Sequence, residues 1–240
     1  MTKPGVIGGR RSHDVLRKEL AKATPGRVLD APAGTGVLAR YLRDLGWDVS
    51  CADLDEGNFE LDDFPFEKVN LNRGLPYGDE SFDAVVCANG LHRLFNPGGA
   101  IREFFRVLDS GGLLYITVNN YSSLEMRLRF LLYGSLCNTV NLGEFKQTID
   151  DPEANVRHLL MFPQLANLLE GAGFAITNVK AASIKPRHVL LAPLALPIWL
   201  ASWVVVPETA RKNRLREMRK PPVFPGGKYL YIEARKPARV

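Results

Sequence analysis

The sequence predicts an α/β fold built on a parallel, doubly wound sheet. Strand-like and helix-like segments alternate through the first half of the chain, which is the pattern of such folds. The segment Ala84–Ala88 is apolar without a break, as expected of a strand covered by helices on both faces. The 240 residues, 46% hydrophobic and 24% charged, suffice for one globular domain with a core. We therefore expect a single domain over residues 1–240.

The elements follow from local patterns, beginning with an amphipathic helix that Thr24-Pro25-Gly26 ends. The pair Gly111-Gly112 marks a turn into a later strand. The predicted strands cover residues 27–30, 48–53, 84–88, 113–118, 174–179 and 228–234. The predicted helices cover residues 12–23, 36–45, 98–108, 122–136 and 163–171. Because helices connect the strands, we expect right-handed crossovers.

The charge balance limits the choice of partners. The net charge is +5, which is short of the strongly basic balance of nucleic-acid-binding domains, so no nucleic-acid partner is expected. Most of the excess lies in residues 208–220, where six basic residues stand against two acidic ones. This segment indicates either a local anionic partner or a solvated helix face.

The cysteines and the N-terminal segment indicate a reducing compartment. Cys51, Cys87 and Cys137 are odd in number and none has the spacing of a metal or redox pair, so we predict neither a metal site nor disulfides. Residues 1–11 are polar and basic, without the apolar run of a signal peptide. We therefore expect a cytoplasmic protein.

A loop of small residues follows the first strand, which ends in Asp30. Small residues let a ligand approach the backbone, and the start of the next helix offers free amide donors. Gly34 and Gly36 are followed by Ala39 where a dinucleotide loop has its third glycine, so the loop alone also suits NAD. Asp53 ends the second strand, where a carboxylate can bind the ribose hydroxyls of NAD or of another nucleoside cofactor.

Four segments in chain order separate these two possibilities. They are VLDAPAGTG at 28–36, NLNRGLPYGDESFD at 70–83, RVLDSGGLL at 106–114 and LLEGAGF at 168–174. Together they resemble motifs of the class I S-adenosylmethionine-dependent methyltransferases, particularly the UbiE-like group. The resemblance implies a Rossmann-like, doubly wound, mostly parallel seven-stranded sheet with a helical lid and insertions. It also implies S-adenosylmethionine as the cofactor and S-adenosylhomocysteine as its product.

The resemblance implies which residues hold the methionine part of the cofactor. Asp30 would do so together with backbone amides of the loop, those of Ala31, Ala33, Gly34 and Gly36. Pro32 stands where the family often has a glycine. Because proline has no N–H group, one amide contact is missing at that position.

The resemblance also assigns residues to the rest of the cofactor. Asp53 would bind the ribose, and Leu54 would pack on the adenine. Asn70 and Leu71 would contact the adenine edge, and Asn89 would lie near the sulfonium. Asn70 replaces an aspartate that is common in the family, but its amide oxygen still accepts a hydrogen bond.

Methyl transfer by direct displacement mainly requires alignment of the reactants. A base is needed only if the acceptor loses a proton, and His92, just after the predicted strand at residues 84–88, is the candidate. The alternative is that His92 only structures its loop. Asn119, Tyr121 and His158 are candidate acceptor contacts in a predicted lid over residues 119–162, with solvated turn residues as the alternative.

The segment Val189–Val206 contains no charged residue. As one helix it would extend roughly 27 Å, near the thickness of a bilayer core. A single crossing is incompatible with the flanking strands, which we expect in one sheet. Pro193 and Pro197 also favour a broken or bent helix.

The insertion over residues 187–225 therefore has two interpretations. It either covers the acceptor pocket or a homodimer interface, or it contacts a membrane surface through residues 189–220. In the second case Trp199 and Trp203 would anchor it beside the basic segment. The protein would then be peripheral to the inner face of the membrane. Both interpretations point to a lipophilic acceptor.

The sequence thus predicts an S-adenosylmethionine-dependent methyltransferase that acts on a small, lipophilic or lipid-linked acceptor, with oxygen favoured as the acceptor atom. Two alternatives stay open. One is a nicotinamide-dependent oxidoreductase, and the other is a non-catalytic, membrane-associated binding module of the same fold.

Overall fold

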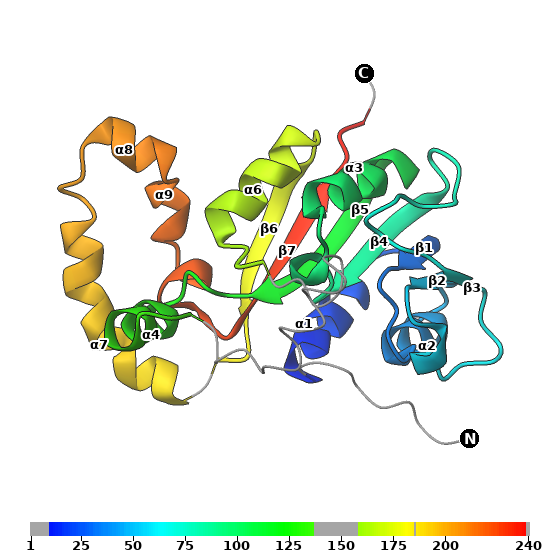
Figure 1. The fold of residues 1–240 in the computed structure, drawn as a ribbon, viewed down its shortest axis with the longest axis horizontal. Coiled ribbons are helices and arrows are strands. Elements are labelled where there is room, and N and C mark those ends of the chain that lie inside the picture. Colours follow the sequence, from blue (N-terminus) through cyan, green and yellow to red (C-terminus); the bar gives the residue numbers. More distant parts are fainter. Residues whose placement is uncertain (1–9, 137–157, 185, 239–240) are drawn as a thin grey trace, which may run out of the picture.

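The computed structural model describes residues 10–136, 158–184 and 186–238. Its centre is a seven-stranded sheet in the order β3-β2-β1-β4-β5-β7-β6 (Figure 1). Only β7 runs antiparallel to its neighbours β5 and β6, so the predicted, mostly parallel sheet is confirmed. The strands are β1 Arg27–Asp30, β2 Asp48–Asp53, β3 Phe66–Lys68, β4 Phe82–Ala88, β5 Leu108–Asn119, β6 Ala175–Ala182 and β7 Tyr229–Arg235.

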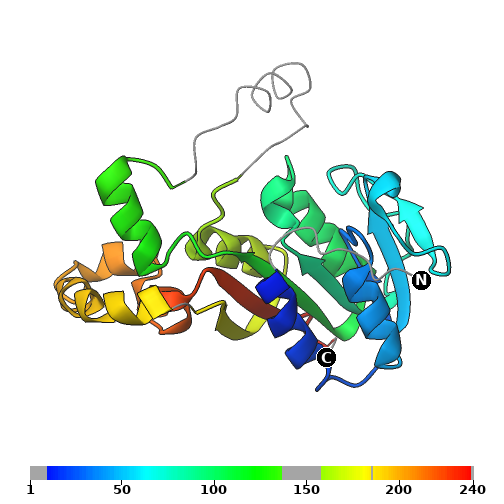
Figure 2. The ribbon, with the colours of Figure 1, turned by 90° about the horizontal axis from the view of Figure 1, so that it is seen from below.

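Helices cover both faces of the sheet, with α1 and α2 on one face and α3 and α6 on the other (Figure 2). The main helices of the described residues are α1 Arg10–Leu20, α2 Val37–Asp44, α3 Pro97–Val107, α4 Leu124–Tyr133, α6 Phe162–Gly171, α7 Pro186–Ala201, α8 Pro207–Lys212 and α9 Leu215–Met218. Shorter helical turns are η1 Glu56–Asn58, η2 Leu91–Arg93 and η3 Pro222–Gly226.

The two faces of the sheet form separate hydrophobic cores. Val85 and Val86 are both fully buried, yet they belong to different cores. The same holds for Val28 and Leu29 of the neighbouring strand. Because successive side chains of a strand point to opposite faces, an unbroken apolar strand can serve both cores. The run Ala84–Ala88 was therefore correctly interpreted as a central strand.

Two details of the sheet differ from the sequence prediction. The edge strand β3 was not predicted, because Phe66–Lys68 is too short and too exposed to show a pattern. The strand β5 begins at Leu108, so Gly111-Gly112 lies inside it rather than before it. The register shifts there, since Phe82 pairs with Leu108 but Ala84 pairs with Leu113. The glycines accommodate this irregularity, and Gly111 has a φ of +84°.

The apolar insertion forms a longer helix than its prolines suggest. Pro193 and Pro197 lie inside α7, which continues to Ala201 without a break. The inner side of the helix packs on α4 and η3. No helix of the described residues is both long and apolar enough to span a bilayer.

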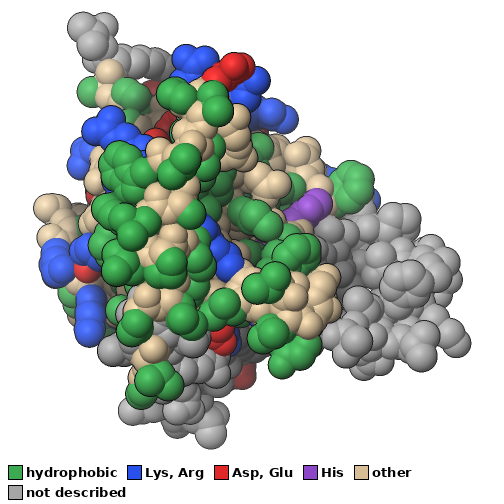
Figure 3. All heavy atoms as spheres, turned by 90° about the vertical axis from the view of Figure 1, so that its left-hand side faces the viewer, with side chains coloured by type: hydrophobic (Ala, Val, Ile, Leu, Met, Phe, Trp, Pro, Cys, Tyr) green, Lys and Arg blue, Asp and Glu red, His purple; other side chains and the backbone are tan. Residues whose placement is uncertain are grey.

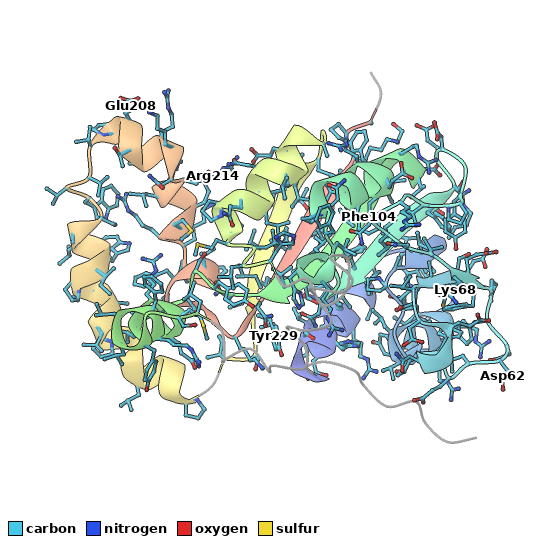
Figure 4. The ribbon with its side chains drawn as sticks, in the orientation of Figure 1. Asp62, Lys68, Phe104, Glu208, Arg214 and Tyr229 are labelled. Atoms are coloured by element: carbon cyan, nitrogen blue, oxygen red, sulfur yellow. The ribbon has the colours of Figure 1, made fainter. Side chains whose placement is uncertain are left out.

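Helices α4 and α7–α9 with η3 form a lobe beside the β6 edge of the sheet (Figure 1). We call residues 124–133 and 186–226 the side lobe. It grows from the carboxyl ends of two strands, since α4 follows β5 and α7 follows β6. Arg214 of the lobe forms an ion pair with Glu170 of α6 and donates to Asn167 Oδ1 at 2.8 Å (Figure 4). The side lobe is thereby tied to the sheet domain.

Candidate active site

The candidate site lies at the carboxyl edge of the sheet, where β1, β2, β4 and β5 end. Asp30 and Asp53 are the last residues of β1 and β2. Asn89 follows β4 directly, and Asn119 is the last residue of β5. Because these strands are parallel, their ends meet at one edge, which is where open α/β sheets bind ligands.

Asp53 connects the first loop to the second strand. Its carboxylate accepts hydrogen bonds from the backbone N–H of Gly34 at 2.7 Å and of Asp55 at 3.1 Å. Each oxygen thus has one donor from the protein. A carboxylate has about four acceptor positions, so Asp53 retains acceptor capacity for a pair of hydroxyl groups.

The loop amides assigned to the methionine part all donate within the protein. Ala31 N–H bonds the carbonyl of Val86 at 2.9 Å, and Ala33 N–H bonds that of Ala52 at 3.0 Å. Gly34 donates to Asp53, and Gly36 donates to the carbonyl of Ala33 at 3.0 Å. In this structure, the first three N–H groups hold the loop between β2 and β4, and that of Gly36 closes a turn within the loop.

Asp30 is the buried carboxyl group of the site, with only 1% of its surface exposed. Neither carboxylate oxygen has a hydrogen-bond partner of good geometry among the described residues. Burial raises the pKa of Asp30 to about 8, the Asp53 carboxylate adds to this rise, and the Ala39 backbone amide opposes it. A buried, unpaired carboxyl group is costly, and it is suited to a ligand that brings a cation or a hydrogen-bond donor.

The two loop glycines have different surroundings. Both have positive φ, +56° at Gly34 and +81° at Gly36. A Cβ on Gly36 would lie 2.6 Å from Leu61 Cδ1, so the chain itself requires glycine there. A Cβ on Gly34 would meet no atom within 4 Å. The space above Gly34 is therefore open to a ligand.

Beyond Asp53, the edge offers an apolar surface. Leu54 is 59% exposed, although it directly follows a buried strand. Leu71 is buried, and Asn70 accepts a hydrogen bond from the Asn72 backbone at 3.0 Å through Oδ1. An exposed leucine beside a carboxylate with remaining acceptor capacity fits a flat aromatic ring. The donor set of this edge therefore fits S-adenosylmethionine.

Asn89 is held in an unusual backbone conformation, with a φ of +55°. Its N–H bonds the carbonyl of Thr117 at 3.0 Å, and its Nδ2 donates to Ser12 Oγ at 2.6 Å. Its Oδ1 is buried without a hydrogen-bond partner among the described residues. Ser12 lies inside α1 and brings that helix to the site.

The two candidate histidines are neighbours in the fold. His92 lies on η2, and its carbonyl accepts a hydrogen bond from the His158 backbone at 2.8 Å. Both rings are partly exposed. His158 Nε2 is buried and has no hydrogen-bond partner among the described residues. The histidine that follows β4 and the predicted lid are thus joined by their backbones.

The other predicted acceptor contacts also lie together. Asn119 Nδ2 donates to the Tyr121 hydroxyl at 3.5 Å, and both side chains are partly buried.

A surface hollow of about 620 Å³ opens beside α6 rather than over Asp30 and Asp53. Its lining comes from His158, Leu159, Leu160, Gln164, Asn167 and Leu168. Among the described residues, no cluster of side chains suits a metal ion.

Sequence comparison places the chain in a known family. The family described as a methyltransferase domain matches residues 10–179. A demethylmenaquinone methyltransferase of Renibacterium salmoninarum is 36% identical over 115 residues, which cover 46% of this chain and 48% of that protein. A malonyl-(acyl-carrier protein) O-methyltransferase of Pseudescherichia vulneris is 31% identical, with 55% and 59% covered. The C-methyltransferase UbiE of Xanthomonas oryzae is 36% identical, with 38% and 42% covered. The chain spans about half the length of the curated relatives it matches.

Solved structures agree on the fold. An S-adenosylmethionine-dependent methyltransferase from Mesorhizobium loti has a TM-score of 0.59 at 17% identity, covering 94% of this chain and 98% of that one. A Burkholderia thailandensis didemethyltoxoflavin methyltransferase, solved with S-adenosylhomocysteine, has a TM-score of 0.55 at 18% identity, covering 94% and 76%. The cyclase SpnF has a TM-score of 0.58 at 23% identity, covering 94% and 82%.

The predicted family, fold class and cofactor are therefore confirmed, and the comparisons give no support to the nicotinamide alternative. The matched family covers more than half of the chain, from α1 into β6, and includes the whole edge that carries Asp30, Asp53 and Asn89. The chain belongs to the class I S-adenosylmethionine-dependent methyltransferases, in the UbiE-like group.

Proposed function

We propose that the chain methylates a small, lipophilic or lipid-linked acceptor at a hydroxyl oxygen, with S-adenosylmethionine as the methyl donor. The observation that supports this proposal most is the position of the side lobe. Its apolar helices α4 and α7 grow from β5 and β6 at the edge that carries Asp30 and Asp53. An apolar acceptor would therefore meet the cofactor beside an apolar surface.

The proposed cofactor contacts follow the predicted order along the edge. Asp53 binds the ribose hydroxyls with its remaining acceptor capacity. Leu54 packs on the adenine, while Asn70 and Leu71 border it. Asp30 receives the cationic amino group of the methionine part, which compensates for its burial.

The loop amides take a different part in this proposal. Because Ala31, Ala33, Gly34 and Gly36 donate within the protein, they act mainly by shaping the loop. The open space above Gly34 then receives the methionine chain. Asn89 presents its buried Oδ1 toward the positive charge near the methyl group.

The protein contributes alignment and a proton acceptor. Bound S-adenosylmethionine supplies a methyl group that the sulfonium charge activates. Asn119, Tyr121 and His158 orient the acceptor, and His92 accepts the hydroxyl proton as the oxygen attacks. We favour oxygen because a hydroxyl acceptor needs a base, and His92 stands at this edge. Of the predicted lid over residues 119–162, residues 137–157 lie outside the described part of the chain.

We further propose that residues 189–220 contact a membrane surface, from which the acceptor is drawn. A homodimer interface is the competing use of the same residues. The helix α7 is apolar and lies largely exposed on the side lobe, which supports either a membrane surface or a second copy of the chain as its partner.

The direct test uses S-adenosylmethionine with a labelled methyl group and pairs of hydroxylated aromatic acceptors, each with and without an isoprenoid tail. We expect labelled methyl ethers, with a lower KM for the tailed member of each pair. Ring-carbon products would overturn the oxygen assignment, and equal KM values would overturn the lipophilic one. Binding of S-adenosylhomocysteine without turnover on any acceptor would favour the non-catalytic binding module.

The role of His92 has its own control. We expect His92→Gln to lower kcat by roughly 100-fold if it accepts the proton, while S-adenosylhomocysteine affinity stays unchanged. His158→Gln should raise KM more than it lowers kcat. If His92→Gln turned over normally at every pH between 6 and 9, His92 would be a structural residue.

A further inference from the structure

The outer surface of the side lobe is unusually apolar for a protein exposed to water. Along α7 and the turn after it, Leu190 is 79% exposed and Val204 is 86% exposed. At the end of α4, Leu131, Leu132 and Tyr133 are exposed to a similar degree. Figure 3 shows a broad area of apolar side chains on the side of the molecule where Figure 1 places α4 and α7. Such an area marks an interaction surface rather than a random scatter of leucines.

The exposed residues of α4 and α7 form one surface because the two helices pack together. Leu124 of α4, Ala195 of α7 and Phe224 of η3 share a small buried cluster, with Leu128 and Ile198 packed against it. This contact uses the inner side of each helix. A helix that is apolar all round is normally buried, so the outer side of α7 lacks the cover that its sequence requires.

Basic side chains lie next to this surface. The helices α8 and α9 follow α7, and Figure 3 shows Lys and Arg side chains along the upper margin of the apolar area. Arg211, Arg216 and Lys220 are exposed and have no ion-pair partner among the described residues. Lys212 pairs with Glu208 within α8, so that pair adds no net charge. The margin therefore carries uncompensated positive charge.

Aromatic and basic groups also alternate at the end of α7. Trp199 and Trp203 pack edge to face with ring centres 5.5 Å apart. The Arg219 guanidinium lies 4.2 Å from the centre of the Trp203 ring, and its Nε donates to Ser202 Oγ at 2.7 Å. Exposed tryptophan beside arginine is the combination that favours a bilayer interface.

A second copy of the chain fits this surface less well. A twofold interface places the same patch of both subunits together, so the basic margin of one subunit would meet either the basic margin of the other or the far side of its apolar area. An anionic lipid surface instead offers apolar chains to α4 and α7 and negative head groups to the margin. The charges thus favour lipid over self-association.

We propose that the outer surface of the side lobe binds an anionic lipid bilayer, with α4 and α7 lying in its interface and residues 211–220 at the head groups. This inference rests on the proposed membrane contact of residues 189–220, and it adds α4 and the requirement for anionic lipid. Because α4 follows β5 and α7 follows β6, such docking holds the carboxyl edge of the sheet, where we place the acceptor, near the lipid.

The test is sedimentation of the whole chain with vesicles of phosphatidylcholine alone or with about one third phosphatidylglycerol. We expect binding to the anionic vesicles at least 10-fold tighter than to the neutral ones, with loss at high salt. The variant Leu131→Ser with Val204→Ser removes exposed apolar groups, and Arg211→Gln with Arg216→Gln removes uncompensated charge. At roughly 1 kcal/mol per basic residue, the charge variant should bind about 30-fold more weakly.

The control variant is Lys68→Gln with Arg102→Gln, which removes two exposed charges from β3 and α3, outside the side lobe. It should bind vesicles like the unchanged chain. Each variant should keep its melting temperature and its affinity for S-adenosylhomocysteine, which shows that the sheet domain is intact. Vesicle binding without methyl transfer would therefore contradict the proposed methyl transfer and leave the lipid proposal standing.

Two results would overturn the lipid proposal. One is that the chain binds neither kind of vesicle, or that all three variants weaken its vesicle binding equally. The other is a dimer, measured by light scattering without lipid, that Leu131→Ser with Val204→Ser converts to monomer. The second result would assign the same surface to a second copy of the chain.

Discussion

The carboxyl edge of the sheet around Asp30 and Asp53, which we call the cofactor edge, differs from the side lobe in how its side chains are satisfied within the protein. At the cofactor edge, the loop amides and Asp53 are fixed by hydrogen bonds within the protein, and Asp30 is buried. In the side lobe, large apolar side chains face solvent, and a small buried cluster around Leu124 and Phe224 packs α4, α7 and η3 together. The cofactor edge is therefore preorganised for its ligand, whereas the outer surface of the side lobe is not covered by any described part of the chain.

This difference explains why the cofactor edge identifies its ligand more closely than the side lobe identifies its partner. A fixed polar site determines the chemistry of its ligand, because each donor and acceptor has a definite place. An apolar surface determines only that its partner is apolar, and its charged margin adds the sign of the partner's charge. The donor of the methyl group is therefore known better than its acceptor.

The largest expected effect is on the polar side of this comparison. Asp53→Ala removes the acceptor of the ribose hydroxyls and also frees the Gly34 and Asp55 amides. Each charge-assisted hydrogen bond contributes about 1.5–3 kcal/mol, so we expect S-adenosylhomocysteine affinity to fall roughly 100-fold or more. Isothermal titration calorimetry measures this loss.

Asp62→Ala is the matched control, because Asp62 is an exposed aspartate on a loop near the β3 edge (Figure 4). It should bind like the unchanged chain. Asp53→Asn should bind with intermediate affinity, since it keeps one acceptor oxygen. Equal affinity of the Asp53→Ala variant and the unchanged chain would remove Asp53 from the ribose site.

The polar region was also the more predictable from sequence. Asp30 and Asp53 end short strands, and the neighbouring motifs identify their context, so their places at the edge followed directly. The contact of Asn89 with Ser12 was not predicted, because it joins residues 77 positions apart. Nor does the sequence indicate that the loop amides donate to β2 and β4, since that depends on the register of neighbouring strands.

The side lobe was predictable in composition but not in arrangement. The apolar run after residue 189 is evident in the sequence, and so is the basic segment that follows it. The packing of α7 on α4 is not, because α4 was interpreted as part of a lid. Pro193 and Pro197 favoured a broken or bent helix, and α7 is unbroken from Pro186 to Ala201. Contacts between distant segments decided how the lobe packs.

The second prediction separates folding from binding within the first loop. Gly36→Ala places a Cβ 2.6 Å from Leu61 at a φ of +81°, and the strain and overpacking should lower the free energy of unfolding by roughly 2 kcal/mol or more. Gly34→Ala meets open space, so it should cost about 1 kcal/mol of backbone strain.

Urea unfolding and calorimetry together check this contrast. The Gly34→Ala variant should lose proportionally more cofactor affinity, because its Cβ enters the space assigned to the ligand. The interpretation fails if Gly36→Ala is as stable as the unchanged chain, or if Gly34→Ala binds S-adenosylhomocysteine normally.

The third prediction concerns the pH dependence that Asp30 confers. Its pKa is about 8 in the folded chain and near 3.8 in a solvated one, so between these values the folded state holds a proton that the unfolded state has released. Stability should therefore fall as pH rises between these two values, by roughly 1 kcal/mol per pH unit from this group. Asp30→Asn cannot titrate and should remove this part of the slope.

Urea unfolding of both chains at several pH values, without cofactor, measures that difference. The Asp30→Asn variant should also bind S-adenosylhomocysteine more weakly, because it lacks the charge proposed to face the amino group. Parallel stability curves for the two chains would mean that Asp30 stays ionised in the fold.

The smallest expected effect tests whether the two regions are coupled. Arg214 joins the side lobe to α6 through Glu170 and Asn167, but Glu170 is 48% exposed, so Arg214→Gln should cost only about 0.5–1 kcal/mol. Hydrogen exchange should nevertheless rise in α8 and α9 and stay unchanged in β1 and β2, because only the lobe loses an anchor. Lys212→Gln, which breaks the exposed pair with Glu208 inside α8, should leave the link to α6 intact and the exchange of α9 unaltered. If Arg214→Gln also weakened S-adenosylhomocysteine binding, the lobe and the cofactor edge would be one cooperative unit, and the contrast between a fixed site and a separately anchored lobe would have to be abandoned.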